Sequence, residues 1–242
     1  MHIAAKSQQF MDAGDPVISV DTKKKELIGN YKNGGREYAP QGEAQQVNTH
    51  DVGDRDAQKR VKRSIPYGVY DQGQNTGGVS VGVDHDTAEF AVATIRQWWK
   101  QMGEQTYPNT RKVLITADSG GSNGSRRRAW KSQLQRLADD TALEFHVAHF
   151  PPGTSKWNKI EHRMFSQITL NWRGRPLTSH EVIVNLIANT TTRTGLRIAA
   201  ALDPGCYQTG IKISEREMNA LRIQREEFHP EWNYAILPRP SP

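Results

Sequence analysis

The chain has 242 residues, which is long enough for one large domain or two small ones with a sizeable core. Its 32 Lys and Arg residues exceed its 26 Asp and Glu residues, and the net charge of +6 suits a polyanionic partner without establishing one. A single cysteine, Cys206, excludes an intrachain disulfide and a metal site built from several cysteines. No run of about 18 apolar residues and no apolar signal core is present, so the sequence predicts neither a transmembrane helix nor secretion.

The first part of the chain has the pattern of a meandering sheet. We expect a short helix and a turn over 1–15, a β-branched strand over 16–21 and a second strand over 26–31. Residues 32–63 are rich in Gly, Gln, Asn and charged residues, which predicts an irregular basic insert with little core of its own. Two further strands are expected over 64–84.

After residue 86 the apolar pattern alternates between the period of helices and that of strands. We expect helices over 87–102, 125–139, 155–172 and 179–191, and strands over 113–118 and 143–150. This alternation indicates parallel strand pairing. Further along, we expect a short strand near 211–213 and a helix over 214–225 that begins with a capping box. The whole pattern predicts an α/β fold with a mixed sheet and helices on both faces.

Three carboxylates stand out by their positions. Asp21 ends the first strand, Asp118 ends the 113–118 strand beside a glycine-rich turn, and Glu161 lies early in the helix after the next strand. If the first strand and the 113–118 strand are neighbours, Asp21 and Asp118 come together at the sheet centre, outside the carboxyl ends of the strands, where ligands bind in α/β proteins. Three hard oxygen ligands suit Mg²⁺ or Mn²⁺, and a pair of such ions supports phosphoryl transfer. An Asp at a strand end is also very often only a turn residue, so spacing alone leaves both interpretations open.

Other candidate sites have weaker patterns. The stretch 84–86, Asp-His-Asp, is expected to cap the following helix rather than to bind a metal. We expect His149 to be packed or to lie at the edge of a pocket, because it shares a strand face with apolar residues. The glycine-rich turn 120–124 lacks the Lys-Ser/Thr of a phosphate-binding loop, which disfavours nucleotide hydrolysis.

Basic residues gather in three clusters, two of which flank the proposed acids. The clusters cover 23–25, 59–63 and 126–128. A charge run is usually a solvated surface, but these runs border acids that would otherwise repel a phosphate backbone, so we expect contact with nucleic acid. Trp157 lies near Glu161, where it is suited either to stack on a base or to pack in the core.

Several long motifs carry a resemblance to a known family. The second acid lies in Ile115-Thr116-Ala117-Asp118-Ser119-Gly120-Gly121-Ser122-Asn123, and the third acid lies in Pro151-Pro152-Gly153-Thr154-Ser155-Lys156-Trp157-Asn158-Lys159-Ile160-Glu161-His162. Residues 17–26, 65–71 and 81–90 and the tail Phe228-His229-Pro230-Glu231-Trp232-Asn233-Tyr234 extend the similarity over nearly the whole chain. These stretches resemble the DDE transposases of one bacterial insertion-sequence group, the Rhodopirellula transposase family.

The resemblance implies a ribonuclease-H-like fold, with a mixed five-stranded sheet flanked by helices. It implies that Asp21, Asp118 and Glu161 form a catalytic triad that binds two Mg²⁺ or Mn²⁺ ions. The implied reaction is DNA strand cleavage at insertion-sequence ends, followed by attack of the freed 3′-hydroxyl on target DNA. The implied partners are transposon-end and target DNA, bound by a homo-oligomer in the bacterial cytoplasm, at the nucleoid. The DNA-binding residues that we expect are Lys23, Lys24, Lys25, Arg126, Arg127, Arg128, Lys156, Trp157 and Asn158.

We expect a catalytic domain over 1–195, including the basic insert at about 32–63, and a C-terminal extension over 196–242 packed on it. Family members carry an N-terminal helix-turn-helix region that recognises transposon ends. This chain begins only about twenty residues before Asp21, so we expect that region to be absent and the chain to be a fragment, a degraded copy or one of two reading frames. Two other functions stay open: an inactive DNA-binding remnant, and a non-specific nuclease of the same fold.

Overall fold

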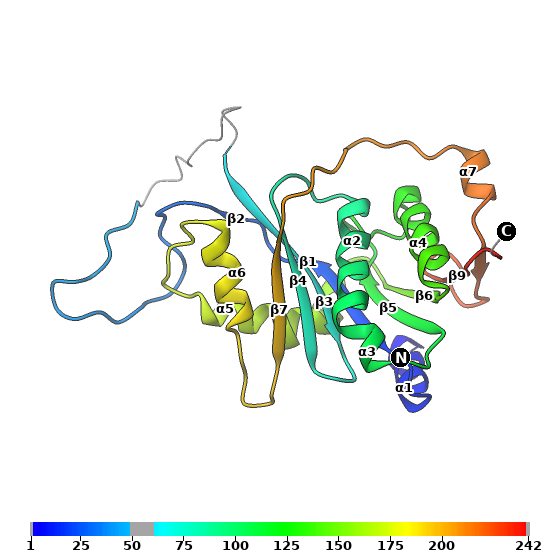
Figure 1. Cartoon of the computed structure of the whole chain (residues 1–242), viewed down its shortest axis with the longest axis horizontal. Helices are drawn as coiled ribbons and strands as arrows, with labels where there is room; N and C mark the ends of the chain where they lie inside the picture. Colours follow the sequence, from blue (N-terminus) through cyan, green and yellow to red (C-terminus); the bar gives the residue numbers. More distant parts are fainter. Residues whose placement is uncertain (1, 49–60, 241–242) are drawn as a thin grey trace.

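The computed structural model describes residues 2–48 and 61–240. Nine strands within these residues form one mixed sheet that crosses the molecule (Figure 1). The strands are β1 (Val17–Thr22), β2 (Glu26–Leu27), β3 (Arg63–Asp71), β4 (Thr76–Gly82), β5 (Lys112–Asp118), β6 (Glu144–Phe150), β7 (Arg197–Asp203), β8 (Ile223–Arg225) and β9 (Asn233–Ile236). Their order is β7-β4-β3-β1-β5-β6-β9-β8, and β2 pairs with β3.

Helices cover both faces of this sheet (Figure 1). They are α1 (His2–Asp12), α2 (Ala88–Trp98), α3 (Glu104–Thr106), α4 (Arg128–Thr141), α5 (Ser166–Asn171), α6 (His180–Ala188) and α7 (Glu215–Asn219). Two π-helical turns, η1 (Trp99–Gly103) and η3 (Glu161–Phe165), and one 3₁₀ turn, η2 (Ser155–Trp157), complete the set. None of the described helices is long and apolar enough to cross a membrane.

The centre of the sheet has the strand directions of a ribonuclease-H-like fold. Strand β3 runs antiparallel to both β1 and β4, whereas β1, β5 and β6 are parallel to one another. In β1 the side chains of Val17, Ile18 and Val20 are fully buried, as expected for a strand covered on both faces. The predicted mixed α/β fold with helices on both faces is therefore confirmed.

Strands from the last part of the chain make the sheet wider than five strands. Strand β7 lies parallel to β4 at one edge, and β9 lies antiparallel to β6 and carries β8 at the other edge. The strand predicted near 211–213 is wrong, because this stretch has no regular structure and Ile211 is exposed. A three-residue apolar alternation is too short to specify a strand, and other segments occupy both sheet edges. The division into 1–195 and 196–242 stays a prediction.

Close packing of one helical segment on the sheet depends on a glycine. Gly68 of β3 lies opposite Asp21 in the antiparallel register. A Cβ atom at Gly68 would lie 2.6 Å from Phe165 and 2.7 Å from Met164, closer than side chains pack. The absence of a side chain therefore lets η3, which begins with Glu161, lie directly on β3.

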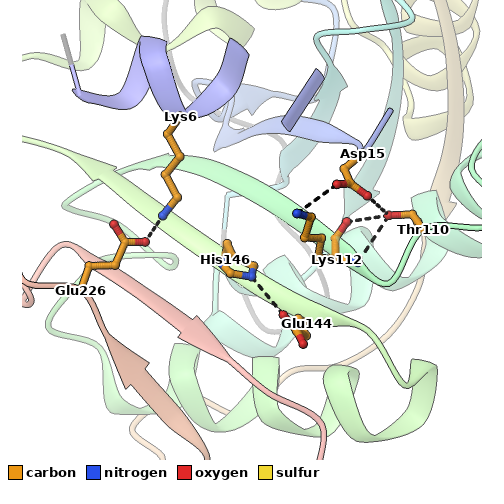
Figure 2. A network of polar contacts seen from close by, with 7 residues as sticks. All are labelled: Lys6, Asp15, Thr110, Lys112, Glu144, His146 and Glu226. Atoms are coloured by element: carbon orange, nitrogen blue, oxygen red, sulfur yellow. Dashed lines mark hydrogen bonds and ion pairs between the residues drawn. The ribbon is translucent and has the colours of Figure 1, made fainter. Parts of the chain in front are cut away.

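Helix α1 is fixed to the sheet beside β5 and β6 (Figure 2). Lys6 forms an ion pair with Glu226, which ties the helix to the chain just after β8. Lys112 Nζ lies 3.3 Å from the Asp15 carboxylate and 4.8 Å from the centre of the Phe10 ring. These contacts hold α1 against the face of the sheet on which the candidate site lies.

Candidate active site

Strand register brings Asp21 and Asp118 to the same edge of the sheet. In the parallel β1–β5 pair, Val17 is opposite Leu114 and Val20 is opposite Ala117. One step further along this register, Asp21 is opposite Asp118, at the carboxyl ends of both strands. Because side chains alternate between faces, both carboxylates belong to the face that α1 and η3 cover. The condition for Asp21 and Asp118 to come together, that these two strands are neighbours, is met.

A buried amide joins the third segment to both strands. Asn158 Nδ2 donates to the Val20 carbonyl oxygen and to Asp118 Oδ1, both at 3.2 Å. Ser19 Oγ donates to Asn158 Oδ1 and accepts a hydrogen bond from the backbone N–H of Ile160 at 3.0 Å. Ser19 and Asn158 are fully buried. They hold the segment that leads into Glu161 at a fixed position above β1 and β5.

The helix carrying Glu161 differs locally from the expected one. A continuous helix was predicted over 155–172, but the chain forms a 3₁₀ turn, leaves the helical conformation at Asn158 and then enters a π-helical turn at Glu161. Short π-helical turns store local strain and occur often at functional sites. The break at Asn158 is what lets its amide reach Asp118.

All three carboxylates have a raised pKa. Burial, followed by the charges of Asp118 and Glu161, raises the pKa of Asp21 to about 8. Burial raises the pKa of Asp118, although the Asn158 hydrogen bond opposes this shift. Burial and the Asp118 charge raise the pKa of Glu161, while nearby Lys23 lowers it. A partly desolvated group of like charges is stabilised by protons or by a cation.

The donor chemistry of this trio fits a hard divalent cation. Carboxylate oxygens are the ligands that Mg²⁺ and Mn²⁺ take in proteins. Over residues 2–48 and 61–240, however, no group of three or more His, Cys, Asp or Glu side chains is arranged so that it could hold a metal ion. The three acids are thus neighbours on one face rather than a closed ligand set.

A fourth acid, Asp86, lies beside the trio. Its charge contributes to the raised pKa of Asp21, and its Oδ1 accepts a hydrogen bond from Thr22 Oγ1 at 3.1 Å. Asp86 does not cap α2, because Thr87 is the N-cap and its side chain accepts from the N–H of Phe90. Asp86 was not predicted as a site residue, and its signal in the sequence is its place in an Asp-His-Asp triplet.

The first basic cluster is split between the interior and the surface. Lys23 is buried, with its Nζ 3.2 Å from Glu26 and 4.2 Å from the centre of the Trp172 ring. Lys24 and Lys25 are exposed, and Lys25 Nζ lies 4.0 Å from Asp86. Lys23 was predicted to contact DNA, but its side chain instead makes contacts inside the protein, beside the site.

The other expected DNA-binding residues divide in a similar way. Arg126, Arg127 and Arg128 are exposed where α4 begins, and Arg128 forms an ion pair with Glu215. Lys156 is exposed, and Trp157 is 56% exposed, so the ring is not packed in the core. The buried Asn158 instead bonds only within the protein. From the cluster at 59–63, residues 59 and 60 lie outside the described residues.

His149 links the site to the end of the chain. Its Nδ1 lies 3.0 Å from the Asp118 carbonyl oxygen, and its Nε2 lies 3.1 Å from the Tyr234 hydroxyl. Burial lowers the pKa of His149 to about 4. The prediction of a packed histidine is confirmed, since this side chain is 1% exposed.

Comparison with known proteins gives a family and two related structures. The model of the Rhodopirellula transposase DDE domain matches residues 1–238. No curated protein matches the chain. A Mos1 transposase paired-end complex with the left transposon end is 13% identical, with a TM-score of 0.46, and covers 74% of this chain and 49% of that chain. A Mos1 mariner paired-end complex with Mn is also 13% identical, with a TM-score of 0.44, and covers 75% and 49%.

This chain therefore spans about half the length of these Mos1 chains. The family match extends over nearly all of the chain, including each of the three acids. The chain belongs to the family of the Rhodopirellula transposase DDE domain.

Proposed function

We propose that this DDE domain catalyses metal-dependent cleavage and strand transfer of DNA at insertion-sequence ends. The observation that carries the proposal is the convergence of Asp21, Asp118 and Glu161 on one face of the sheet, where the charges of Asp118 and Glu161 raise the pKa of Asp21 and the charge of Asp118 raises that of Glu161. Membership of a DDE transposase family supports the same reaction class.

In this proposal the three acids supply the oxygen ligands for two Mg²⁺ or Mn²⁺ ions. When bound, such ions activate the attacking oxygen and stabilise the leaving oxygen of an in-line displacement at phosphorus. Asn158 orients the Asp118 carboxylate through its Nδ2, and Ser19 holds Asn158 from the strand below. The Lys23 charge lies close enough to Glu161 to favour the ionised form of that carboxylate.

The exposed basic residues around the site are the proposed DNA contacts. Lys24 and Lys25 follow Asp21, Arg126 and Arg127 lie before α4, and Lys156 precedes the Glu161 segment. Lysine and arginine bind phosphates without reading sequence, so these residues would position a strand rather than select an end. The proposed partners are transposon-end and target DNA, bound by a homo-oligomer at the bacterial nucleoid.

Metal-dependent nicking of supercoiled plasmid DNA tests the assignment of the acids. Asp21→Asn, Asp118→Asn and Glu161→Gln should each lower the nicking rate by about a hundredfold or more in Mg²⁺ or Mn²⁺. Glu104→Gln, at an exposed position where α3 begins, is the matched control and should leave the rate unchanged. Normal activity in any of the three variants would remove that residue from the triad.

Two further outcomes separate the competing functions. If calorimetry detects no Mn²⁺ binding that depends on the three acids, the chain is a DNA-binding remnant without catalysis. If the chain nicks DNA but never joins a 3′-hydroxyl end to a second DNA, it is a nuclease of the same fold.

A further inference from the structure

A large cavity lies beside the candidate active site, on the same face of the sheet. Its volume is about 970 Å³, and three chain segments line it: α1, the segment 156–163, and the tail segment 228–233. Thr116 of β5 lines the cavity. It lies two residues before Asp118, so the two side chains are on the same face of the strand. The segment 156–163 also contains Glu161, so one segment contributes residues both to the cavity and to the group of acids.

Aromatic rings form much of the cavity wall. Phe228 and His229 meet edge to face with ring centres 4.6 Å apart, and His229 stacks on Trp232 at 4.8 Å with an interplanar angle of 25°. Trp157, more than half exposed, also lines the cavity from the segment that leads to Glu161. Phe228, His229 and Trp232 belong to the tail motif of the family resemblance, for which the proposed reaction provides no role.

The charges that line the cavity are of one sign. Lys156, Lys159 and Arg163 line it, whereas its lining residues, all in the described part of the chain, include neither Asp nor Glu. Glu231 Oε1 lies 3.2 Å from His229 Nδ1, but Glu231 is not among the residues that line the cavity. A cavity with aromatic walls and cationic side chains matches a ligand that has both a flat ring and a phosphate.

One buried acceptor at the cavity is left without a partner. Asn233 is 3% exposed, and its Nδ2 donates to the carbonyl oxygens of Phe228 and His229 at 2.9 and 3.3 Å. Its Oδ1 finds no hydrogen-bond partner among the residues that the structure describes. Leaving a buried acceptor unpaired is unfavourable, so this atom calls for a donor such as the N–H group of a nucleobase.

We infer that this cavity takes an unpaired nucleotide of the DNA strand bound at the acids, with its base among the aromatic rings. The inference rests on the proposed function, because that function places a DNA strand beside Asp118. Trp232 and Phe228 supply stacking surfaces, Asn233 Oδ1 accepts from the base, and Lys156, Lys159 and Arg163 face the phosphates. A base inside a duplex has both faces stacked on its neighbours, so only an unpaired nucleotide can place its base among these rings.

Fluorescence anisotropy with two labelled DNAs in EDTA tests this inference without catalysis. One DNA is a blunt duplex, and the other is the same duplex with a short single-stranded 3′ overhang. We expect the full chain to bind the overhang DNA about tenfold more tightly, the gain that stacking of one base provides. Trp232→Ala and Phe228→Ala should remove this preference, whereas Trp232→Phe, which keeps a ring, should retain it. Tyr38→Ala, at a 99% exposed ring outside the cavity, is the matched control.

A third DNA, whose overhang has phosphates and sugars but no bases, separates stacking from charge. It should bind like the blunt duplex. Equal affinity of the chain for blunt and overhang DNA, an intact preference in Phe228→Ala, or tight binding of the base-free overhang would each overturn the inference. Self-association of the chain that Phe228→Ala abolishes would assign the cavity to a second copy and overturn it too.

Nicking measured on the same preparations keeps the two proposals apart. A chain that prefers overhang DNA but never nicks would refute the proposed function and keep the cavity assignment. A chain that nicks in Mg²⁺ but binds blunt and overhang DNA equally would refute the cavity assignment alone.

Discussion

The two faces of strands β1 and β5 have very different surroundings, although their residues alternate along the same backbone. On one face, Ile18 and Ile115 are fully buried in a continuous apolar core with α2 and α4. On the other face, the same strands carry Ser19, Asp21 and Asp118, which meet the polar segment before η3. Many interchangeable contacts hold the first face, whereas a few individual hydrogen bonds and charges determine the second.

This difference means that the faces should respond to mutation in different ways. The apolar face loses stability when volume is removed, because its contacts are numerous and non-directional. The polar face carries the desolvation cost of its carboxylates, so it should lose activity before it loses stability. Four predictions test this contrast, in order of decreasing effect on the free energy of unfolding.

Truncation on the apolar face should have the largest effect. Leu134 of α4 is fully buried in the core beneath the sheet. Leu134→Ala should lower the free energy of unfolding by about 3 kcal/mol, because it removes buried methyl groups and leaves a cavity. Denaturant unfolding measures the change, and Leu170→Ala, at a 53% exposed position, should change it by less than about 0.5 kcal/mol. Equal losses in both variants would contradict the assigned burial.

His149 is a titratable residue buried among apolar side chains, so we expect the free energy of unfolding to depend on pH. Its folded-state pKa of about 4 lies below the usual value of 6.5, so the unfolded chain takes up a proton first as the pH falls. Its contribution is complete above pH 6.5 and decreases by about 3 kcal/mol as the pH falls toward 4.

Unfolding measured between pH 4 and 7 should therefore show a smaller slope in His149→Gln than in the unchanged chain. Gln105→Ala, at an exposed position without a titratable group, is the control that keeps the slope. An identical slope in His149→Gln would show that this imidazole takes up its proton without opposing the fold.

A substitution at Gly68 tests how closely η3 must pack on the polar face of the sheet. A Cβ atom there would meet Phe165, Met164 and Ile160 at 2.6–2.9 Å, so Gly68→Ala should push η3 away from β3. We expect a loss of about 2 kcal/mol in stability and a larger proportional loss of metal-dependent nicking, because Glu161 moves with η3. Gly120→Ala is the matched control, since its added Cβ has no atom within 4 Å. A wild-type nicking rate in Gly68→Ala would show that the position of Glu161 does not depend on close packing of η3 on β3.

The smallest change in stability should accompany a large loss of activity. Asp21→Asn removes a buried carboxylate whose neighbours repel its charge, so the metal-free protein at pH 8 should be equally stable or slightly more stable. Thermal unfolding without metal, compared with nicking in Mg²⁺, measures the two effects together. A marked drop in melting temperature would show that Asp21 supports the fold.

The sequence predicted the structure well where a local pattern of residues is compatible with one kind of element. The apolar run before Asp21 and the one before Asp118 predicted two buried strands, and β1 and β5 are such strands and lie next to each other. The position of Glu161 early in the next helix marked it as the third candidate acid, and it lies within electrostatic reach of both. The roles of these acids stay predictions until activity is measured.

The remaining contacts could not be predicted, because they depend on residues far apart in the chain. Ser19 and Asn158 are separated by 139 positions, and neither residue type indicates its partner. Asp86 is likewise brought to Asp21 by the fold alone. The π-helical turn at Glu161 has no sequence signal in a stretch with the pattern of a regular helix, and its contact with Gly68 joins residues far apart in the chain.

The sheet edges have a consequence for how the protein folds as it is synthesised. Strand β4 is covered by β7, and β6 is covered by β9, so both partners come from residues after 196. Until those residues leave the ribosome, the nascent chain has two unpaired strand edges, which are sites for pairing with another chain. Folding of the region around the acids is thus coupled to the synthesis of β7 and β9, and a chain interrupted before Asn233 would leave β6 open to aggregation.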